Sequence, residues 1–200
     1  CIMGLTEKGC YVTASGAKSG DKLVLTKSAG IEGTAILASD REATLKRALS
    51  GKMLRNAKNF YQQISVVKDA LTAYKTGGVH AMHDPTEGGV AGGIHEMADA
   101  AGVGVKVFEK AIPIKPETAK ICSYFEIDPL QLISSGALLI SAEAESAEKI
   151  IANLAKQQIE AAVIGEFIKD KNQRLLIRKN GAVQALPRPL SDHLWTALMQ

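Results

Sequence analysis

The alternation of apolar and polar positions predicts strands and helices that follow one another along the chain. Short apolar or alternating runs predict strands at residues 22–27, 79–82, 105–108, 137–141, 162–168 and 174–178, with a further short strand at 11–13. Apolar residues at helical spacing predict helices at residues 29–38, 41–76 with a break near 50, 117–125, 146–157 and 191–199. This order favours an α/β (α+β) fold, a layered mixed sheet flanked by helices, with the strand at 174–178 at an edge.

The last helical segment before residue 77 carries a clear apolar stripe. Its members are Val66, Val67, Ala70, Leu71 and Tyr74. Gly77-Gly78 follows and is typical of a helix C-cap. The pattern therefore predicts an amphipathic helix that ends just before the strand at 79–82.

Residues 80–93 have the sequence HAMHDPTEGGVAGG, which is typical of a strand end, a tight turn and the start of a glycine-rich helix. Asp84-Pro85 stops the strand, because proline fixes φ and biases the residue before it towards extended geometry. Thr86 or Asp84 can cap the helix, and Glu87 suits the positive end of its dipole. An apolar stripe follows at helical spacing, formed by Val90, Ile94, Met97, Ala98 and Ala101.

Four glycines, at positions 88, 89, 92 and 93, lie in the first two turns of this helix. Each costs about 1 kcal/mol relative to alanine in a helix interior. Such a cost suggests a compensating use. Either the helix packs tightly against the sheet, or it also approaches a ligand, since the free N–H groups of a helix N-terminus are a natural anion site. Both interpretations stay open on the residues alone.

Composition narrows the class of protein. The 200 residues are 46% hydrophobic and only 4% aromatic, so the core must be built from Ala, Ile, Leu and Val. The net charge of +3 comes from 24 basic and 21 acidic residues spread along the chain, which argues against nucleic-acid binding. No run is long and apolar enough for a membrane span, so a cytoplasmic protein is expected. The three cysteines form no CxxC pattern, which indicates neither a disulfide framework nor a zinc site.

Few residues outside the glycine turn indicate chemistry. His80, His83 and Asp84 have weak metal-ligand spacing, and no metal site is predicted. Ser135 lacks the GxSxG pattern of a hydrolase nucleophile, and no Walker A sequence occurs. Lys27 ends a strand and either faces a phosphate or, more commonly for lysine, stays solvated. Cys122 is expected in the core. No catalytic residue is predicted.

Several motifs in order resemble the C-terminal domain of the AIR synthase-like superfamily, and within it the hydrogenase maturation factors of the HypE type. The match extends from about residue 19 to 168. Its motifs are GDKLVLT at 20–26, GIEGTA at 30–35, the turn and helix start at 80–89, HEMADAAGVGV at 95–105, AIPIKP at 111–116, FEIDPL at 125–130 and SGALL at 135–139.

This resemblance implies an ATP-using parent protein with Mg²⁺ as a further cofactor. A preceding domain would hold most nucleotide and metal ligands and form a homodimer, and the present domain would close over that site. HypE-type proteins dehydrate a carboxamide on their own C-terminal cysteine to a thiocyanate, which becomes cyanide on the iron of [NiFe] hydrogenase. The predicted nucleotide- or phosphate-contacting residues are Asp84, Thr86, Glu87, Gly88, Gly89, Ser135, Gly136 and Lys27.

The resemblance also divides the chain. Residues 1–18 are expected to be a linker or remnant of a missing N-terminal domain, 19–186 the AIR synthase-related domain, and 187–200 a C-terminal extension with a helix. The chain begins with Cys1 and lacks the family's C-terminal cysteine tail, so it is expected to be inactive by itself. His83 and Glu87 replace the family's usual arginines, and Ser134-Ser135-Gly136 replaces its Asn-Glu-Gly.

These departures keep other functions open. One alternative is another enzyme of the superfamily, either a phosphoribosylformylglycinamidine cyclo-ligase or a small-molecule kinase. A second alternative is a non-catalytic domain that binds a partner maturation protein. The expected partners are therefore a nucleotide or phosphate-bearing small molecule, the chain's own preceding domain and hydrogenase maturation proteins.

Overall fold

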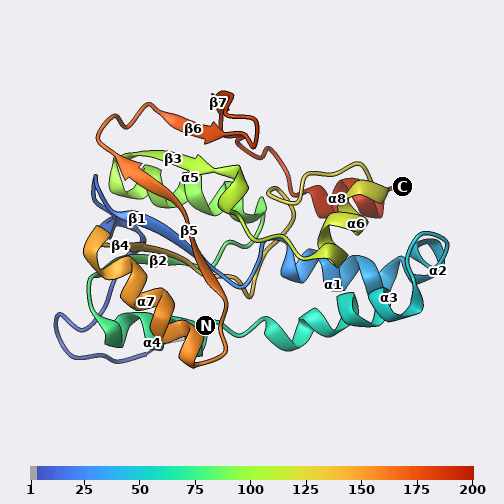
Figure 1. The fold of residues 1–200 in the computed structure, drawn as a ribbon, viewed down its shortest axis with the longest axis horizontal. Helices are drawn as coiled ribbons and strands as arrows, with labels where there is room; N and C mark the ends of the chain where they lie inside the picture. The colour runs from blue at the N-terminus through green and yellow to red at the C-terminus, as the bar shows by residue number, and fades with distance from the viewer. Residues whose placement is uncertain (1–3) are drawn as a thin grey trace.

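Within residues 4–200, which the computed structural model describes, seven strands form one sheet with the order β2-β4-β1-β5-β3-β6-β7 (Figure 1). The strands are β1 Lys22–Thr26, β2 Val79–His83, β3 Gly104–Phe108, β4 Leu139–Ala142, β5 Ala161–Ile168, β6 Arg174–Ile177 and β7 Val183–Ala185. Only the β3–β6 pair is parallel. The mixed sheet is therefore confirmed, although β7, not β6, forms the edge.

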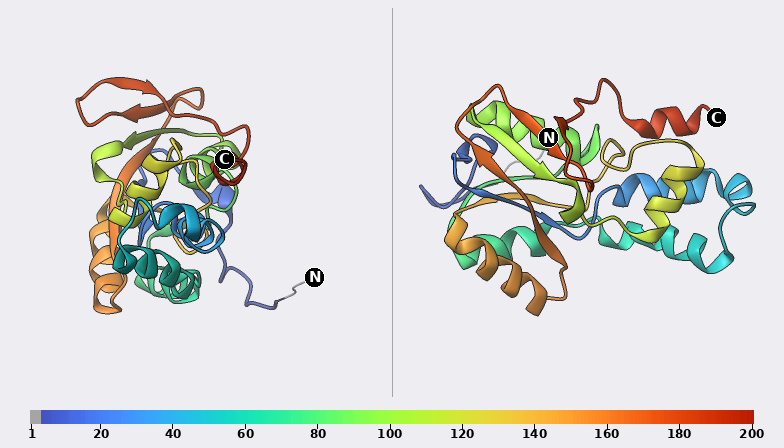
Figure 2. Two further views of the ribbon diagram at one scale, coloured as in Figure 1. Left: turned by 90° about the vertical axis from the view of Figure 1, so that its right-hand side faces the viewer. Right: turned by 45° about the horizontal axis from the view of Figure 1, so that its top comes forward.

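The helices cover both faces of the sheet and form a separate group beside it (Figures 1 and 2). Their bounds are α1 Ile31–Asp40, α2 Glu42–Leu45, α3 Gly51–Lys58, α4 Val67–Thr76, α5 Gly89–Ala101, α6 Pro116–Tyr124, α7 Ala144–Lys156 and α8 His193–Leu198, with 3₁₀ turns η1 Ala14–Gly16, η2 Asn59–Gln63 and η3 Glu109–Ala111. Helix α5 lies on one face, α4 and α7 lie on the other, and the remaining helices pack together beyond the sheet. None of the helices in residues 4–200 has the length and apolar character needed to span a lipid bilayer.

Strand β1 shows why the sheet carries helices on both faces. Its residues alternate in direction, as they do in any strand. Leu23 and Leu25 belong to the buried cluster that includes α5, whereas Val24 belongs to the cluster that includes α4 and α7. All three side chains are fully buried. A central strand with three successive apolar residues, which point alternately to the two faces, thus determines a three-layer arrangement.

The helices beside the sheet have a core of their own. Leu37 of α1, Leu54 of α3 and Phe125 after α6 are buried together with Leu194 and Ala197 of α8. Cys122 lies in the same cluster, as expected, and burial raises its thiol pKa to about 12. The C-terminal helix is thus packed into this core. The predicted domain boundary after residue 186 remains a prediction, but the segment 187–200 packs against the rest of the chain through α8.

Two details of the predicted elements are wrong. Residues 11–13 form no strand, and 3₁₀ turn η1 follows them. The segment 41–76 breaks not only near residue 50 but also at residues 64–66, between η2 and α4. Both errors arise because local composition does not reveal where a chain must bend to pack against distant elements.

Part of the predicted apolar stripe faces solvent instead of the core, whereas Val66 and Ala70 pack against the buried cluster beneath α4 and α7. Val67 is 64% exposed, Leu71 51% and Tyr74 38%, whereas Asp69 and Ala73 are buried. The side chain that turns α4 this way is Asp69, because it accepts a hydrogen bond from the Thr26 hydroxyl at 2.7 Å. A buried polar anchor has therefore overridden the usual inward orientation of an apolar stripe.

Lys27 completes this anchor. Its ammonium group lies 3.1 Å from Asp69 Oδ1 and donates to the carbonyls of Gln63 (3.0 Å), Ser65 (2.9 Å) and Gly136 (2.7 Å). The side chain is only 13% exposed, so the solvated interpretation is wrong. The contact with a phosphate remains a prediction, although all three ammonium protons already have acceptors within the protein.

We expect Asp69→Ala to lower the free energy of unfolding by about 3–5 kcal/mol, because it leaves the Lys27 charge buried without its counterion. Urea denaturation of the variant measures this loss. Glu148→Ala, on the exposed side of α7, is the matched control and should change stability by less than about 0.5 kcal/mol. Equal effects of the two substitutions would contradict the anchoring role.

Candidate functional site

Three segments that are distant in the sequence meet beside the glycine turn. The Ser134 N–H donates to the Pro85 carbonyl at 3.1 Å, and the Gly30 N–H donates to the Ser134 hydroxyl at 2.7 Å. The Gly136 N–H points at Asp84 Oδ1 at 3.4 Å. The start of α1, the turn between β2 and α5, and the loop before β4 therefore form one surface. This surface brings together the predicted residues Asp84, Ser135 and Gly136, with Lys27 behind them.

Helix α5 begins differently from the prediction. Its N-cap is Gly88, in the left-handed region at φ 77°, and neither Asp84 nor Thr86 caps it. Thr86 and Glu87 are instead exposed on the outer side of the turn, whereas Gly88 and Gly89 are buried. The turn follows this path because two successive residues with positive φ, Gly88 and Gly89, can bend the chain where a side chain would be strained.

The glycines of α5 are explained by close contacts within the chain. A Cβ on Gly89 would lie 2.4 Å from the Leu132 carbonyl oxygen, and one on Gly93 would lie 2.9 Å from the Pro85 side chain. Added atoms at Gly88 and Gly92 would meet Pro189 at 3.2 Å and the Glu87 carbonyl oxygen at 3.0 Å. Tight packing is therefore present at all four positions. The additional phosphate contact remains a prediction.

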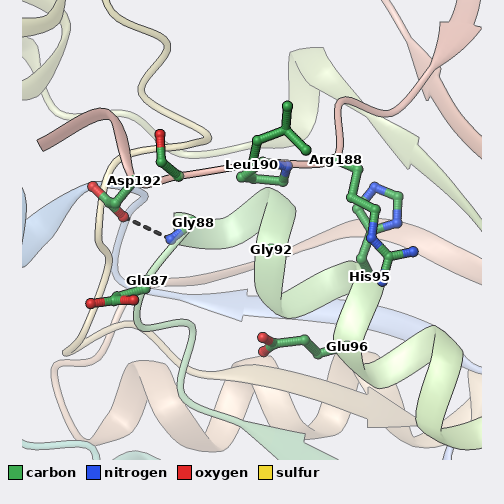
Figure 3. A pocket seen from close by; sticks show the side chains of 10 residues that line it. Glu87, Gly88, Gly92, His95, Glu96, Arg188, Leu190 and Asp192 are labelled. Atoms are coloured by element: carbon green, nitrogen blue, oxygen red, sulfur yellow. Dashed lines mark hydrogen bonds between the residues drawn. The ribbon is translucent and has the colours of Figure 1, made fainter. Parts of the chain in front are cut away.

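A carboxylate of the chain itself lies at the N-terminus of α5. Asp192 Oδ2 accepts the Gly88 N–H at 2.7 Å (Figure 3). Its Oδ1 accepts the N–H groups of Leu194 at 2.7 Å and Ile133 at 3.2 Å. Asp192 is only 3% exposed. One anion thus holds the glycine turn, the loop before β4 and the first turn of α8, in agreement with the preference of helix N-termini for negative charge.

A cavity of about 330 Å³ lies between the start of α5 and the segment 188–192. Its polar side chains include the carboxylates of Glu87 and Glu96 and the guanidinium of Arg188 (Figure 3). Arg188 is tied to Asp99 at 2.6 Å, and Glu96 is tied to His83 at 2.6 Å. The C-terminal segment therefore forms one wall of a polar cavity beside the glycine turn.

The pKa of the Asp84 carboxyl group, which lies in this site, is raised above its ordinary value. Burial raises its pKa, and the nearby Glu32 carboxylate raises it further, whereas the Gly136 N–H and the charges of His83 and Lys27 oppose this shift. Glu32 Oε2 is itself buried without a hydrogen-bond partner in the described part of the chain. Asp84 thus binds its proton more tightly than an ordinary aspartate does, and a second carboxyl group lies near it.

The histidines of the predicted turn have protein partners. His80 Nδ1 lies 2.8 Å from Asp21 Oδ2, and His83 Nε2 lies 2.6 Å from Glu96 Oε2. Among residues 4–200, no three or more His, Cys, Asp or Glu side chains are arranged to hold a metal ion.

Two residues of the site, Asp192 and Glu32, were not predicted. Asp192 precedes a helix and carried a local N-cap signal, but nothing local indicated that it would also reach Gly88. Glu32 lies in the first turn of α1, where an acidic residue is common, and only the fold brings it near Asp84.

Comparison with known proteins identifies the family to which the chain belongs. Residues 18–178 match the family model described as AIR synthase related protein, C-terminal domain. The chain belongs to this family. Asp192 lies beyond the matched region.

HypE proteins are similar to this AIR synthase related chain. The carbamoyl dehydratase HypE of Rhizobium leguminosarum bv. viciae is 30% identical over 181 residues, which cover 85% of this chain and 47% of that protein. The crystal structure of HypE from E. coli, a hydrogenase maturation protein, superposes with a TM-score of 0.76 at 27% identity, covering 94% of this chain and 55% of that one.

A HypE structure solved in complex with ATP has a TM-score of 0.68 at 21% identity, covers 93% of this chain and 55% of that one, and shows the shared fold. The chain spans about half the length of the curated relatives it matches.

We expect Asp192→Ala to destabilise the protein by about 3 kcal/mol or more, because two buried N–H groups and one partly buried N–H group lose their acceptor at about 1–3 kcal/mol each. Amide hydrogen exchange should accelerate at Gly88 and Ile133, and urea denaturation gives the total loss. Asp192→Asn should lose less, since its amide oxygen still accepts. Ser191→Ala, at the exposed neighbouring position, should leave exchange at both amides unchanged.

Asp84→Asn should stabilise the protein at pH 7 and have no effect near pH 3. Because the pKa of Asp84 is raised in the folded state, the folded protein retains a proton that the unfolded chain has lost, and stability falls as pH rises through this window. Thermal unfolding at both pH values measures the difference. The exposed Asp170→Asn is the control, and a stabilisation that persists at pH 3 would disprove the role of ionisation.

Proposed function

We propose that this chain forms one wall of the nucleotide cleft of a HypE-like, ATP-dependent hydrogenase maturation factor. The observation that carries the proposal is the meeting of the Asp84-Pro85-Thr86 turn, the Ser134-Ser135-Gly136 loop and the start of α1 at Gly30. These are the motifs through which the sequence resembles the HypE type. The 30% identity with a carbamoyl dehydratase supports the same reading.

The residues on this surface suit the edge of a phosphate or nucleotide site. Thr86 and Glu87 are exposed, and the Thr86 hydroxyl forms no hydrogen bond within residues 4–200, so it is free to donate to a ligand oxygen. Ser135 offers a second hydroxyl from the adjacent loop. The Gly88 N–H, in contrast, is already bound by Asp192, so any phosphate contact at the helix start would pass through the outer side of the turn.

We infer that ATP, with Mg²⁺, is a ligand that this surface shares with another domain. The unpartnered Glu32 oxygen and the raised pKa of Asp84 give the site two carboxyl groups that can face a hydrogen-bond donor of the nucleotide. Bound ATP would supply the phosphoryl group that activates a carboxamide oxygen for loss. The role of this chain is to position the nucleotide. Most Mg²⁺ ligands are expected from the preceding domain, so the chain by itself is expected to be inactive.

The remaining proposals concern the whole protein. We infer a cytoplasmic homodimer in which this domain closes over its preceding domain, and which works with other hydrogenase maturation proteins. The alternatives are a cyclo-ligase, a small-molecule kinase and a non-catalytic binding domain. They are compatible with the same fold, but no observation on the surface that joins Asp84, Ser135 and Gly136 favours any of them.

The structure also determines which substitution tests the cleft. Gly89→Val should block close approach at the helix start, but its side chain would collide with the Leu132 carbonyl, so loss of binding would be confounded by misfolding. Thr86→Val is the better choice, because it keeps the shape of an exposed side chain and removes only the hydroxyl.

We expect the full-length protein to bind ATP with Mg²⁺ in isothermal titration calorimetry. Thr86→Val should weaken this binding about 2- to 13-fold, which corresponds to the loss of one hydrogen bond of about 0.5–1.5 kcal/mol. Thr196→Val, at an exposed threonine on α8, should bind like wild type. Absence of ATP binding by the full-length protein would refute the nucleotide cleft. If Thr86→Val bound ATP as tightly as wild type, the nucleotide cleft could still exist, but this turn would not contact the nucleotide through Thr86.

A further inference from the structure

The exposed face of α4 carries an apolar stripe with helical spacing, which we name the α4 stripe. It consists of Val67, Leu71 and Tyr74, at positions i, i+4 and i+7. Scattered exposed apolar residues are ordinary on a protein surface, but three in register along one helix form a continuous patch. The stripe is free because Asp69 and Ala73 occupy the inward side of α4.

A groove of about 440 Å³ runs beside the stripe, between α4 and α7, which lie side by side (Figure 1). It is lined by Lys68, Leu71, Thr72, Lys75, Thr76, Asn153, Lys156 and Gln157. Leu71 belongs to both the groove and the α4 stripe. The lining contains three lysines and no carboxylate, and none of the three forms an ion pair within residues 4–200.

The basic character of the groove is local. The whole chain has a net charge of only +3, from 24 basic and 21 acidic residues, and several lysines elsewhere are paired, as in Lys22–Glu166 and Lys115–Glu160. The three lysines around this groove have no ion-pair partner within residues 4–200, and their combined charge of +3 equals the net charge of the whole chain. Such a concentration attracts an acidic partner and accelerates its association.

We propose that the α4 stripe and the groove bind an acidic amphipathic helix of a partner protein. In helix-in-groove recognition the docked helix carries apolar anchors at i, i+4 and i+7, and the α4 stripe offers apolar residues at the same spacing for such a helix to contact. Helix α4 has 10 residues and is about 15 Å long, so it can pair with about three turns of a partner helix. The partner's apolar face covers Leu71 and its neighbours, and its Glu or Asp residues meet Lys68, Lys75 and Lys156.

Other anionic partners fit this surface less well. Single-stranded nucleic acid binds through several stacked aromatic side chains, whereas the α4 stripe has only Tyr74. A lipid headgroup layer needs no groove, but here Thr72, Thr76 and Asn153 line a concave floor in which Asn153 donates to the Thr76 hydroxyl at 3.1 Å. A protein side chain fits between two helices in a way that a flat membrane surface does not.

The test is fluorescence anisotropy with a labelled synthetic 14-residue helix that carries leucines at i, i+4 and i+7 flanked by glutamates. Wild-type protein should bind it, with affinity that falls as salt rises. Leu71→Asp and the triple variant Lys68→Glu/Lys75→Glu/Lys156→Glu should each weaken binding at least tenfold. All four residues are exposed, so circular dichroism and melting temperature should be unchanged.

The matched control is Lys169→Glu/Lys171→Glu, which reverses two exposed lysines after β5 and should leave binding unchanged. A scrambled peptide of equal charge without the leucine stripe should bind at least tenfold more weakly. The proposal is overturned if wild type fails to bind the peptide, if the groove variants bind it as wild type does, or if anionic vesicles or an oligonucleotide bind more tightly. The full-length protein should bind the peptide with the same affinity. If it does not, the groove is covered by another domain of the same protein, and the proposal is overturned.

Discussion

The close approach of α5 to the rest of the chain is the contact on which this structure depends. Gly89 brings the helix start against the Leu132 carbonyl, and Gly93 brings the next turn against Pro85 and β4. With side chains at these positions the helix would have to move outward. The turn before α5 would then lose its contacts with the loop at 134–136, and the surface that joins Asp84 to Gly136 would not form.

Two buried carboxylates stabilise this arrangement from opposite sides. Asp192 binds the N–H groups of Gly88 and Ile133, and so connects the helical core to the glycine turn. Asp69 pairs with Lys27, whose ammonium also holds the Gly136 carbonyl. Both anions have charged or N–H partners, which offset the cost of burying them. Asp69 has a second consequence, because it turns the apolar stripe of α4 outward and leaves it available to a partner.

Local patterns predicted most of the elements correctly. Strand β1 and helix α5 were clear because apolar periodicity and turn residues agreed with the final packing. The grouping of Asp84 with Ser135 and Gly136 came from resemblance to a family and could not have come from spacing, since about 50 residues separate the two segments. The cap of α5, the solvated Lys27 and the strand at 11–13 were wrong, because each depends on a partner or a bend that lies far away in the sequence.

The sequence by itself determined the alternation of strands and helices, the glycine turn and the family, because periodicity, proline and glycine act over a few residues. The tertiary structure alone decided which carboxylate lies at the start of α5, which face of α4 is buried and which groups surround Asp84. These outcomes depend on hydrogen bonds and charges between distant segments, such as Thr26 with Asp69, 43 residues apart, and Gly88 with Asp192, 104 residues apart. Buried polar groups must find partners wherever the fold brings them, and that requirement has no local signature.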